Sequence, residues 1–198
     1  MGAKMSKHLV YMSWGHIGKL LASPQLGAKH ENKLEVLYIP HYIQAMTGVF
    51  LKKGIHCMVD GVGPYSRRHL QAIEYSPRFT RVAYLSCHLN YFPVDKRQRP
   101  LFLYDYRSSG GRRLAASVTN AVAETWIEPR PPTLMACHPD DWTRNAFGCV
   151  DGVYAGPLNI SAICCEPLAM NGTPNLTIAT VKNIGRRMAH GVVSWLEE

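Results

Sequence analysis

The chain has 198 residues, of which 46% are hydrophobic and 18% charged, and this composition excludes a disordered or fibrous protein. The length suits one domain with a sizeable core, so we expect residues 1–198 to form a single domain. The formal net charge of +8 favours an anionic partner, which includes nucleic acid, an anionic lipid surface and a bacterial envelope polymer. No apolar stretch is long enough for a transmembrane segment, and the N-terminus lacks the apolar core of a signal peptide, so we expect synthesis in the cytoplasm.

Apolar runs and segments with helical spacing alternate along the chain. The runs typical of buried strands are residues 8–14, 55–60, 81–87, 100–107 and 159–166. The segments with helical spacing are residues 65–76, 110–126 and 175–196, together with a helix expected to begin near Glu31. This alternation predicts an α/β fold whose twisted, mainly parallel central sheet has about five to six strands and helices on both faces, as in phosphorylase/hydrolase-like proteins.

Two segments are less regular. Pro40 falls inside the helix that is expected to begin near Glu31, so we expect that helix to be kinked or split. Residues 128–157 are rich in proline and glycine and predict an irregular rim of functional size.

The six cysteines show no C-x-x-C pair and no spacing typical of a structural zinc site. Most of them lie in apolar runs, where a thiol behaves as a small buried hydrophobe. We therefore expect reduced core thiols.

Polar residues follow several of the predicted strands. His16, Asp60, His88 and Glu166 lie on or near the carboxyl ends of the first, second, third and last strands. Binding and catalytic sites of parallel sheets gather at these ends. The four residues are therefore the first candidates for a functional site.

His16, Glu31 and His88 are suited to a catalytic zinc site, which commonly has two histidines, one carboxylate and an open position for water. Glu166 would then be a second carboxylate that takes a proton from the water. A structural interpretation stays open, because an acid such as Glu31 is favoured at a helix N-terminus and loop histidines are commonly hydrogen-bonded.

The order of several motifs resembles that of the zinc-dependent N-acetylmuramoyl-L-alanine amidases of cell-separation enzymes and phage endolysins. The motifs are WGH (14–16), KKGIHCMVDG (52–61), YSRRHLQAI (65–73), YLSCHLNYF (84–92), LFLYDYRSSGGRRLAASV (101–118) and AICCEPLAMN (162–171). The resemblance extends from about residue 8 to residue 196.

The resemblance implies a Zn²⁺ cofactor with His16 as first ligand, Glu31 as second and His88 of a Ser-x-His-x-Asn motif as third. It also implies that Glu166 is the catalytic base. Departures concern the loop after His16, which keeps the family pattern only in outline, and His30, which stands beside Glu31 as a competing donor.

The resemblance also bears on three positions outside these four residues. Asn171 matches an asparagine that follows the catalytic glutamate in the family, and the family's arginine falls most plausibly on Arg67, with Arg68 adjacent. Tyr91 replaces the small residue that commonly follows the Ser-x-His-x-Asn motif.

The activity implied is hydrolysis of the amide bond between N-acetylmuramic acid and L-alanine of the peptidoglycan stem peptide. The missing signal peptide and the size favour a phage-type endolysin over a secreted cell-separation enzyme, so we expect a protein that is made in the cytoplasm and acts on the cell wall, with no separate wall-binding domain. Anionic envelope components are expected partners because of the basic charge.

Three alternatives stay open from sequence. One is another zinc amidohydrolase or carboxypeptidase that acts on small acyl-amino acids. The second is a basic nucleic-acid-binding protein, which is disfavoured because no finger, RNP-type or helix-turn-helix signature is present, so no nucleic-acid partner is expected. The third is an inactive binder on the same fold.

Overall fold

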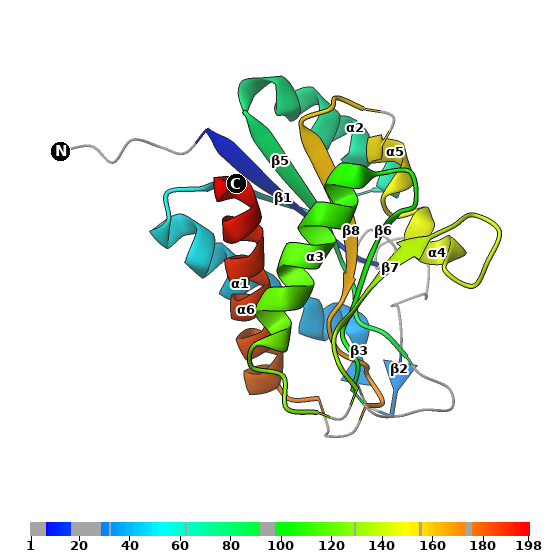
Figure 1. The fold of residues 1–198 in the computed structure, drawn as a ribbon. Helices are drawn as coiled ribbons and strands as arrows, with labels where there is room; N and C mark the ends of the chain where they lie inside the picture. The colour runs from blue at the N-terminus through cyan, green and yellow to red at the C-terminus, as the bar shows by residue number, and fades with distance from the viewer. Residues whose placement is uncertain are drawn as a thin grey trace.

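The computed structural model of the protein describes residues 7–16, 29–31, 33–61, 63–91, 98–128, 130–154, 156–172 and 176–198. Within them, six strands form one sheet in the order β4-β1-β5-β8-β6-β7 (Figure 1). These strands are β1 (His8–Trp14), β4 (His56–Asp60), β5 (Arg81–Cys87), β6 (Leu101–Asp105), β7 (Thr133–Cys137) and β8 (Ile160–Glu166). A separate antiparallel pair consists of β2 (Lys29–His30) and β3 (Lys33–Leu34).

In the described part of the chain, seven helical segments connect or flank these strands. They are α1 (Glu35–Lys52), α2 (Tyr65–Tyr75), the 3₁₀ turn η2 (Ser76–Arg78), α3 (Ser109–Ala123), α4 (Arg144–Phe147), α5 (Asp151–Tyr154) and α6 (Ile178–Glu197). None of these described helices combines the length and the apolar character that crossing a bilayer requires.

The large sheet is mainly parallel. β4, β1, β5 and β8 run in one direction, whereas β6 pairs with β8 in the antiparallel sense and β7 is parallel to β6. The predicted α/β fold with a mainly parallel sheet is therefore confirmed. The reversal at β6 also means that its carboxyl end lies at the edge opposite to that of its neighbour β8.

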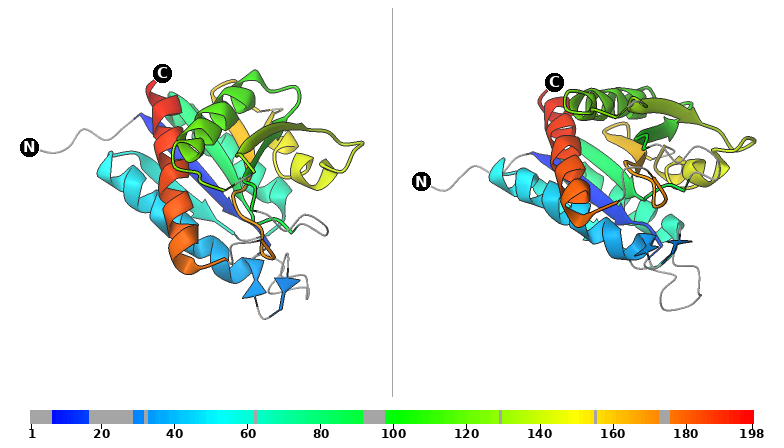
Figure 2. Two further views of the ribbon diagram at one scale, coloured as in Figure 1. Left: turned by 60° about the horizontal axis from the view of Figure 1, so that its bottom comes forward. Right: turned by 90° about the horizontal axis from the view of Figure 1, so that it is seen from below.

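Helices cover both faces of the sheet. Figure 2 shows α1, α6 and α3 along one face, with α2, α4 and α5 on the other. The long helices bury apolar stripes, as in α6, whose Val181, Ile184, Met188 and Val192 lie in the core. A helix with one apolar face is stabilised chiefly by such burial, and these stripes hold the three-layer arrangement together.

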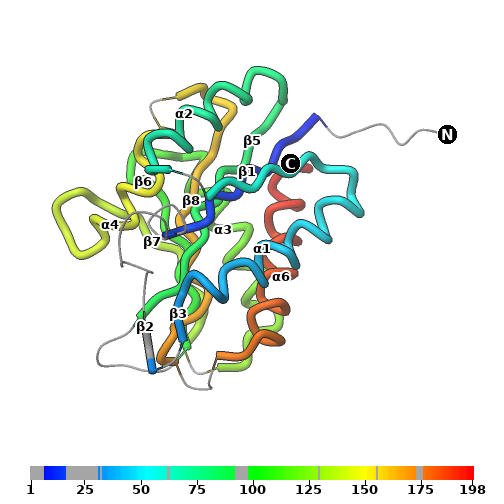
Figure 3. Tube along the Cα trace, turned by 180° about the vertical axis from the view of Figure 1, so that it is seen from behind, coloured from blue at the N-terminus to red at the C-terminus, as the bar shows by residue number. Residues whose placement is uncertain are grey.

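One sequence expectation about the first long helix was wrong, and another keeps only one of its two alternatives. The first long helix begins at Glu35 rather than near Glu31, because the chain forms the β2–β3 pair first; Figure 3 shows this pair at the N-terminal end of α1. Pro40 lies in the second turn of α1 and does not split the helix, so of the two expected effects only a kink stays a prediction.

The segment expected to be irregular, residues 128–157, contains a strand and two short helices. β7 forms there because it pairs in register with β6, from Leu101↔Thr133 to Asp105↔Cys137. Tertiary pairing thus overrides a local composition that disfavours strands.

The strand register brings three chain segments to one edge of the sheet. Trp14 of β1 is opposite Cys87 of β5, and Cys87 is opposite Cys165 of β8. Because these strands are parallel, the residues that follow them emerge side by side. His16, His88 and Glu166 are among these residues.

Candidate active site

Two histidines and a glutamate form a compact cluster at this edge of the sheet. Nδ1 of His88 lies 3.2 Å from Oε1 of Glu35, and Nε2 of His16 lies 3.6 Å from Oε2 of the same carboxylate. One ligand atom from each of the three residues lies within 4.8 Å of the others. The group can therefore hold a metal ion.

Glu35 is held by the start of α1. It is the first residue of the helix, its side chain is 2% exposed, and its Oε1 accepts a hydrogen bond from the Leu89 N–H at 2.9 Å. A carboxylate in a helix's first turn is also favoured by the helix dipole. Charge, burial and hydrogen bonding together fix this carboxylate between the two imidazoles.

The carboxylate beside the histidines is thus Glu35 and not Glu31, the residue favoured from sequence. Glu31 lies in the turn between β2 and β3 with φ of 52° and an exposed side chain. The four-residue difference has a simple cause, since the helix starts at Glu35. The side chain of His30 and the loop residues 17–28 lie outside the described part of the chain.

The Gly15–His16 pair has a steric basis. A Cβ placed on Gly15 would lie 2.6 Å from Nδ1 of His88 and 2.6 Å from the Cys87 carbonyl oxygen, so only glycine lets the His88 ring lie against this backbone. The Gly15 N–H donates to Cys87 O at 2.9 Å. His16 follows with φ of 63°, a left-handed conformation that turns its ring towards His88.

A Gly15→Ala substitution is expected to weaken metal binding by about tenfold or more, because the added methyl group displaces His88. Gly48→Ala is the matched control, since a Cβ at Gly48 has no neighbour within 4 Å in α1. Competition titration with a chromophoric chelator measures both affinities. Equal affinities in the two variants would contradict the packing role of Gly15.

His88 is held from three sides. Its backbone N–H donates to Cys165 O at 2.9 Å, and its carbonyl oxygen accepts from the Tyr42 hydroxyl at 3.1 Å. Its Nε2 lies 2.7 Å from the Tyr65 hydroxyl and 3.7 Å from Sγ of Cys149. The ring is therefore oriented with Nδ1 towards Glu35.

Glu166 shares a cavity of about 540 Å³ with this cluster. The cavity is lined by His16, Glu35, Tyr65, His88, Leu89, Arg144, Asn145, Ala146, Gly148, Cys149, Cys164 and Glu166. Burial raises the pKa of Glu166 to about 7, with His88 opposing the rise and the charges of Glu35 and Cys149 adding to it. The carboxyl group is thus suited to accept and return a proton near neutral pH.

Two thiols lie on the other side of the His88 ring. His88, Cys149 and Cys164 form a second group whose ligand atoms lie within 4.8 Å of one another. A hydrogen bond from Cys164 lowers the pKa of the Cys149 thiol, whereas the same bond together with burial raises that of Cys164. Burial lowers the pKa of His88, but Cys149 and Glu35 outweigh it and raise the value to about 10. All six cysteines of the chain are free thiols.

Arg68 connects the loops around the site. Its Nη1 donates to Ser13 Oγ at 3.0 Å and to Trp14 O at 2.9 Å, and its Nη2 donates to Gly61 O at 3.3 Å and Gly63 O at 2.8 Å. The side chain is buried. The guanidinium thus ties the chain segment that leads to His16 to the loop after β4.

Arg68→Met is expected to lower the free energy of unfolding by about 2–4 kcal/mol, because buried carbonyl groups lose their donors. Arg67→Met is the control, since Arg67 is exposed on the same helix. Urea unfolding of the two variants measures the difference. A similar loss in both would show that Arg68 is not the connecting residue.

The remaining sequence candidates have other positions. Asp60 accepts a hydrogen bond from the Tyr11 hydroxyl at 2.9 Å and is absent from the lining of the site cavity. Asn90 pairs through its backbone with the chain after β8, donating to Leu168 O at 2.9 Å and accepting from the Met170 N–H at 2.8 Å. This pairing brings the loop of His88 alongside the loop that follows Glu166.

Sequence reasoning missed Glu35, Tyr65, Cys149 and Cys164 as site residues. One signal was available for Glu35, which stands immediately before the apolar stripe of α1. A signal was also available for Cys164, because side chains alternate along a strand and Cys164 therefore lies on the same side of β8 as Glu166. Tyr65 and Cys149 come from distant segments and carry no local signal.

The fold is similar to that of several solved structures. The N-acetylmuramoyl-L-alanine amidase AmiC2 of Nostoc punctiforme matches with a TM-score of 0.73 and 18% identity, over 98% of this chain and 100% of that chain. An N-acetylmuramoyl-L-alanine amidase from Clostridium difficile 630 matches with a TM-score of 0.69 and 16% identity, over 96% and 95% of the two chains.

The catalytic domain of CwlV, an N-acetylmuramoyl-L-alanine amidase from Bacillus (Paenibacillus) polymyxa var. colistinus, matches with a TM-score of 0.65 and 12% identity, over 96% of each chain. No protein-family model matches this chain, and a search of curated proteins found no significant match. At these identities the likeness establishes a common fold.

Proposed function

We propose that this protein is a zinc-dependent peptidoglycan amidase that hydrolyses the amide bond between N-acetylmuramic acid and L-alanine. The observation that carries the proposal is the cluster of His16, Glu35 and His88 in one cavity with Glu166, a carboxyl group with a pKa near 7. The fold adds support, because it is that of solved structures described as N-acetylmuramoyl-L-alanine amidases.

The donor set fits zinc. Two imidazoles and one carboxylate are a common ligand set of catalytic zinc, and donors about 2.0–2.1 Å from a tetrahedral ion lie about 3.4 Å apart. The carboxylate oxygens of Glu35 lie 3.2 and 3.6 Å from the two histidine nitrogens. Zinc held by His16, Glu35 and His88 would supply Lewis acidity towards the scissile carbonyl group and the water.

Glu166 carries the proton transfer in this proposal. Its carboxylate accepts a proton from the attacking water and then, as the carboxylic acid, donates that proton to the leaving amino group of L-alanine. In the metal-free chain burial sets the pKa of Glu166 at about 7, so both protonation states are accessible there near neutral pH. Among the described residues no hydrogen bond holds this carboxyl group, which leaves it available to substrate and water.

Tyr65 and Cys149 position His88. If Nδ1 of His88 is the zinc ligand, the N–H of the ring is at Nε2, where it would donate to the Tyr65 oxygen at 2.7 Å and face Sγ of Cys149 at 3.7 Å. Partners of this kind fix the tautomer and orientation of a ligating histidine. In this proposal the two side chains would orient His88 without being ligands themselves.

The proposal is tested by digestion of purified muropeptides with the zinc-loaded protein and mass spectrometry of the products. We expect an intact stem peptide with a new free amino group on L-alanine, together with a sugar that keeps its lactyl carboxylate. Small acyl-amino acids are assayed in parallel. Cleavage of these alone would favour the alternative zinc amidohydrolase or carboxypeptidase.

Two further features of the proposal rest on sequence. The net charge of +8 suits anionic envelope components, and a fall of wall binding with salt would support that contact. The phage-endolysin setting, with action on the host cell wall, stays a prediction.

A further inference from the structure

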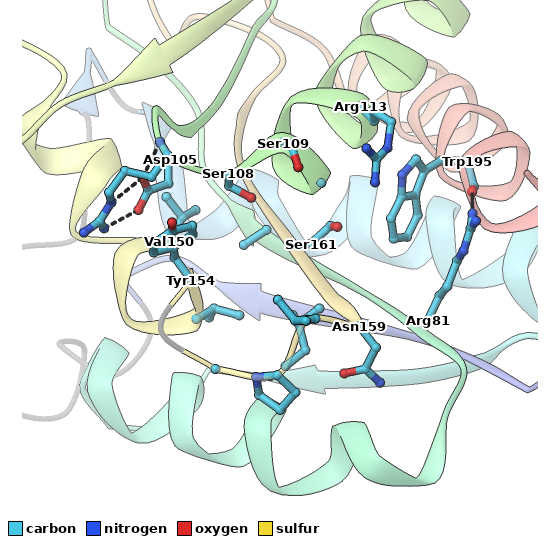
Figure 4. Close-up of a pocket in the computed structure, with 18 residues that line it drawn as sticks. Arg81, Asp105, Ser108, Ser109, Arg113, Val150, Tyr154, Asn159, Ser161 and Trp195 are labelled. Carbon is cyan, nitrogen blue, oxygen red and sulfur yellow. Dashed lines mark hydrogen bonds and ion pairs between the residues drawn. The ribbon is translucent and has the colours of Figure 1, made fainter.

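A second cavity, of about 300 Å³, lies at the edge of the sheet opposite to the His16 cluster. It forms where the carboxyl end of β6 and the start of α3 meet the first residues of β5 and β8 (Figure 4). The antiparallel direction of β6 causes this arrangement, because it brings a strand-to-helix turn to that edge. Nothing in the proposed amidase reaction uses this cavity.

The first turn of α3 presents free donors to the cavity. The N-cap Ser108 accepts the Gly111 N–H at 2.9 Å through its side chain, which leaves the N–H groups of Ser109 and Gly110 without an acceptor among the described residues. Both residues line the cavity. Such N–H groups and the helix dipole favour an anion.

A buried hydroxyl group adds an independent donor. Ser161 is 5% exposed, it lines the cavity, and its Oγ lies against Gly110, where a Cβ atom would collide with it. Within the described part of the chain, the Ser161 hydroxyl has no hydrogen-bond partner. Figure 4 shows it directed into the cavity from β8. The residue is buried while its oxygen opens onto the cavity, so the hydroxyl group is available to a ligand bound there.

The charges around the cavity leave a positive surplus. Asp105 and Arg107 form an ion pair at 2.5 Å and cancel each other. Arg81 donates to the Trp195 carbonyl oxygen at 2.6 Å and keeps its charge, and Arg113 makes no ion pair among the described residues. Both arginines line the cavity together with the helix N-terminus; Figure 4 shows the Arg81 guanidinium turned towards the Trp195 carbonyl oxygen and Arg113 on the side of the cavity beside Trp195.

We propose that this cavity binds a phosphate monoester group. A dianion matches two guanidinium charges and the helix N-terminus, and its several oxygens match the donors of Ser109, Gly110 and Ser161. The apolar wall formed by Val150 and Val153 suits the carbon part of the ester. The proposal concerns a different edge of the sheet and stands whether or not the protein is an amidase.

The test is an NMR titration of the ¹⁵N-labelled, zinc-loaded full chain with inorganic phosphate and with glycerol 3-phosphate. We expect saturable amide shifts at Ser109 and Gly110, and affinity for glycerol 3-phosphate that falls about tenfold or more in Arg113→Gln. Arg112→Gln removes the same charge from an exposed neighbour outside the cavity lining and is expected to bind as the wild type does.

Two further measurements test the Ser161 donor and distinguish a phosphate monoester from a phosphodiester. Ser161→Ala is expected to weaken binding several-fold with an unchanged fold, and a glycerol phosphate polymer, a phosphodiester, is expected to bind more weakly than the monoester. Equal losses in Arg112→Gln and Arg113→Gln, or stronger binding of the polymer, would overturn the proposal. So would shifts confined to residues around His16 and His88, which would place the phosphate at the other site.

Discussion

Replacement of Glu35 by glutamine is expected to abolish zinc binding and amidase activity, whereas Glu31→Gln is expected to change neither. Glu35 supplies the carboxylate oxygens at 3.2 and 3.6 Å from the two histidine nitrogens, and the neutral amide that replaces it is a poor zinc ligand. Loss of a direct ligand is expected to weaken zinc affinity by more than the roughly 10–100-fold seen for outer partners.

Zinc content after dialysis, affinity by chelator competition and the rate of muropeptide cleavage measure these effects. Circular dichroism and urea unfolding control for the fold, because Glu35 also accepts the Leu89 N–H. A Glu31→Gln protein that loses its zinc, beside a Glu35→Gln protein that keeps it, would return the ligand role to Glu31.

Glu166→Gln is expected to reduce the rate of cleavage by about 10²–10⁴-fold while the zinc content is unchanged. Glutamine keeps the size of the side chain but cannot accept a proton from water. A full retention of activity would remove Glu166 from the mechanism. A loss of zinc in this variant would instead indicate that Glu166 is a ligand.

Glu166→Gln is expected to lower the activity but to raise the stability of the folded protein at high pH. The pKa of Glu166 in the folded chain is about 7, above its usual value of 4.5, so the folded protein binds more protons than the unfolded chain between these values. The free energy of unfolding of the wild type therefore falls as the pH rises from 4.5 to 7, by about 3 kcal/mol in total, because the buried carboxyl group loses its proton. Glutamine stays neutral, so the variant does not lose this stability.

Glu166→Gln is thus expected to be more stable than the wild type at pH 8, and by much less at pH 4.5. Urea unfolding of the chelator-treated proteins at both pH values measures the difference, since bound zinc would itself shift the pKa of Glu166. A stability difference that does not depend on pH would contradict the burial of an ionisable Glu166.

The sequence predicted the strands and the edge where the site lies. The apolar runs 8–14, 81–87 and 159–166 became β1, β5 and β8, and their parallel order brings His16, His88 and Glu166 together. These predictions succeeded because buried parallel strands have strong local patterns and because their carboxyl ends necessarily meet at one edge.

The parts that failed depend on contacts between distant segments. The start of α1 was set four residues too early, because Glu31 and Glu35 are both acids that a helix N-terminus accepts and only the β2–β3 pair decides between them. β7 was missed because its pairing with β6 stabilises it. Cys149 reaches His88 from the segment after α4, which no sequence pattern announces.

X-ray absorption spectroscopy at the zinc edge tests the central claim most directly, because two groups of potential ligands share His88. Binding by His16, Glu35 and His88 predicts a first shell of only nitrogen and oxygen at about 2.0–2.2 Å. Sulfur at about 2.3 Å would contradict the account. It would place the metal with Cys149 and Cys164.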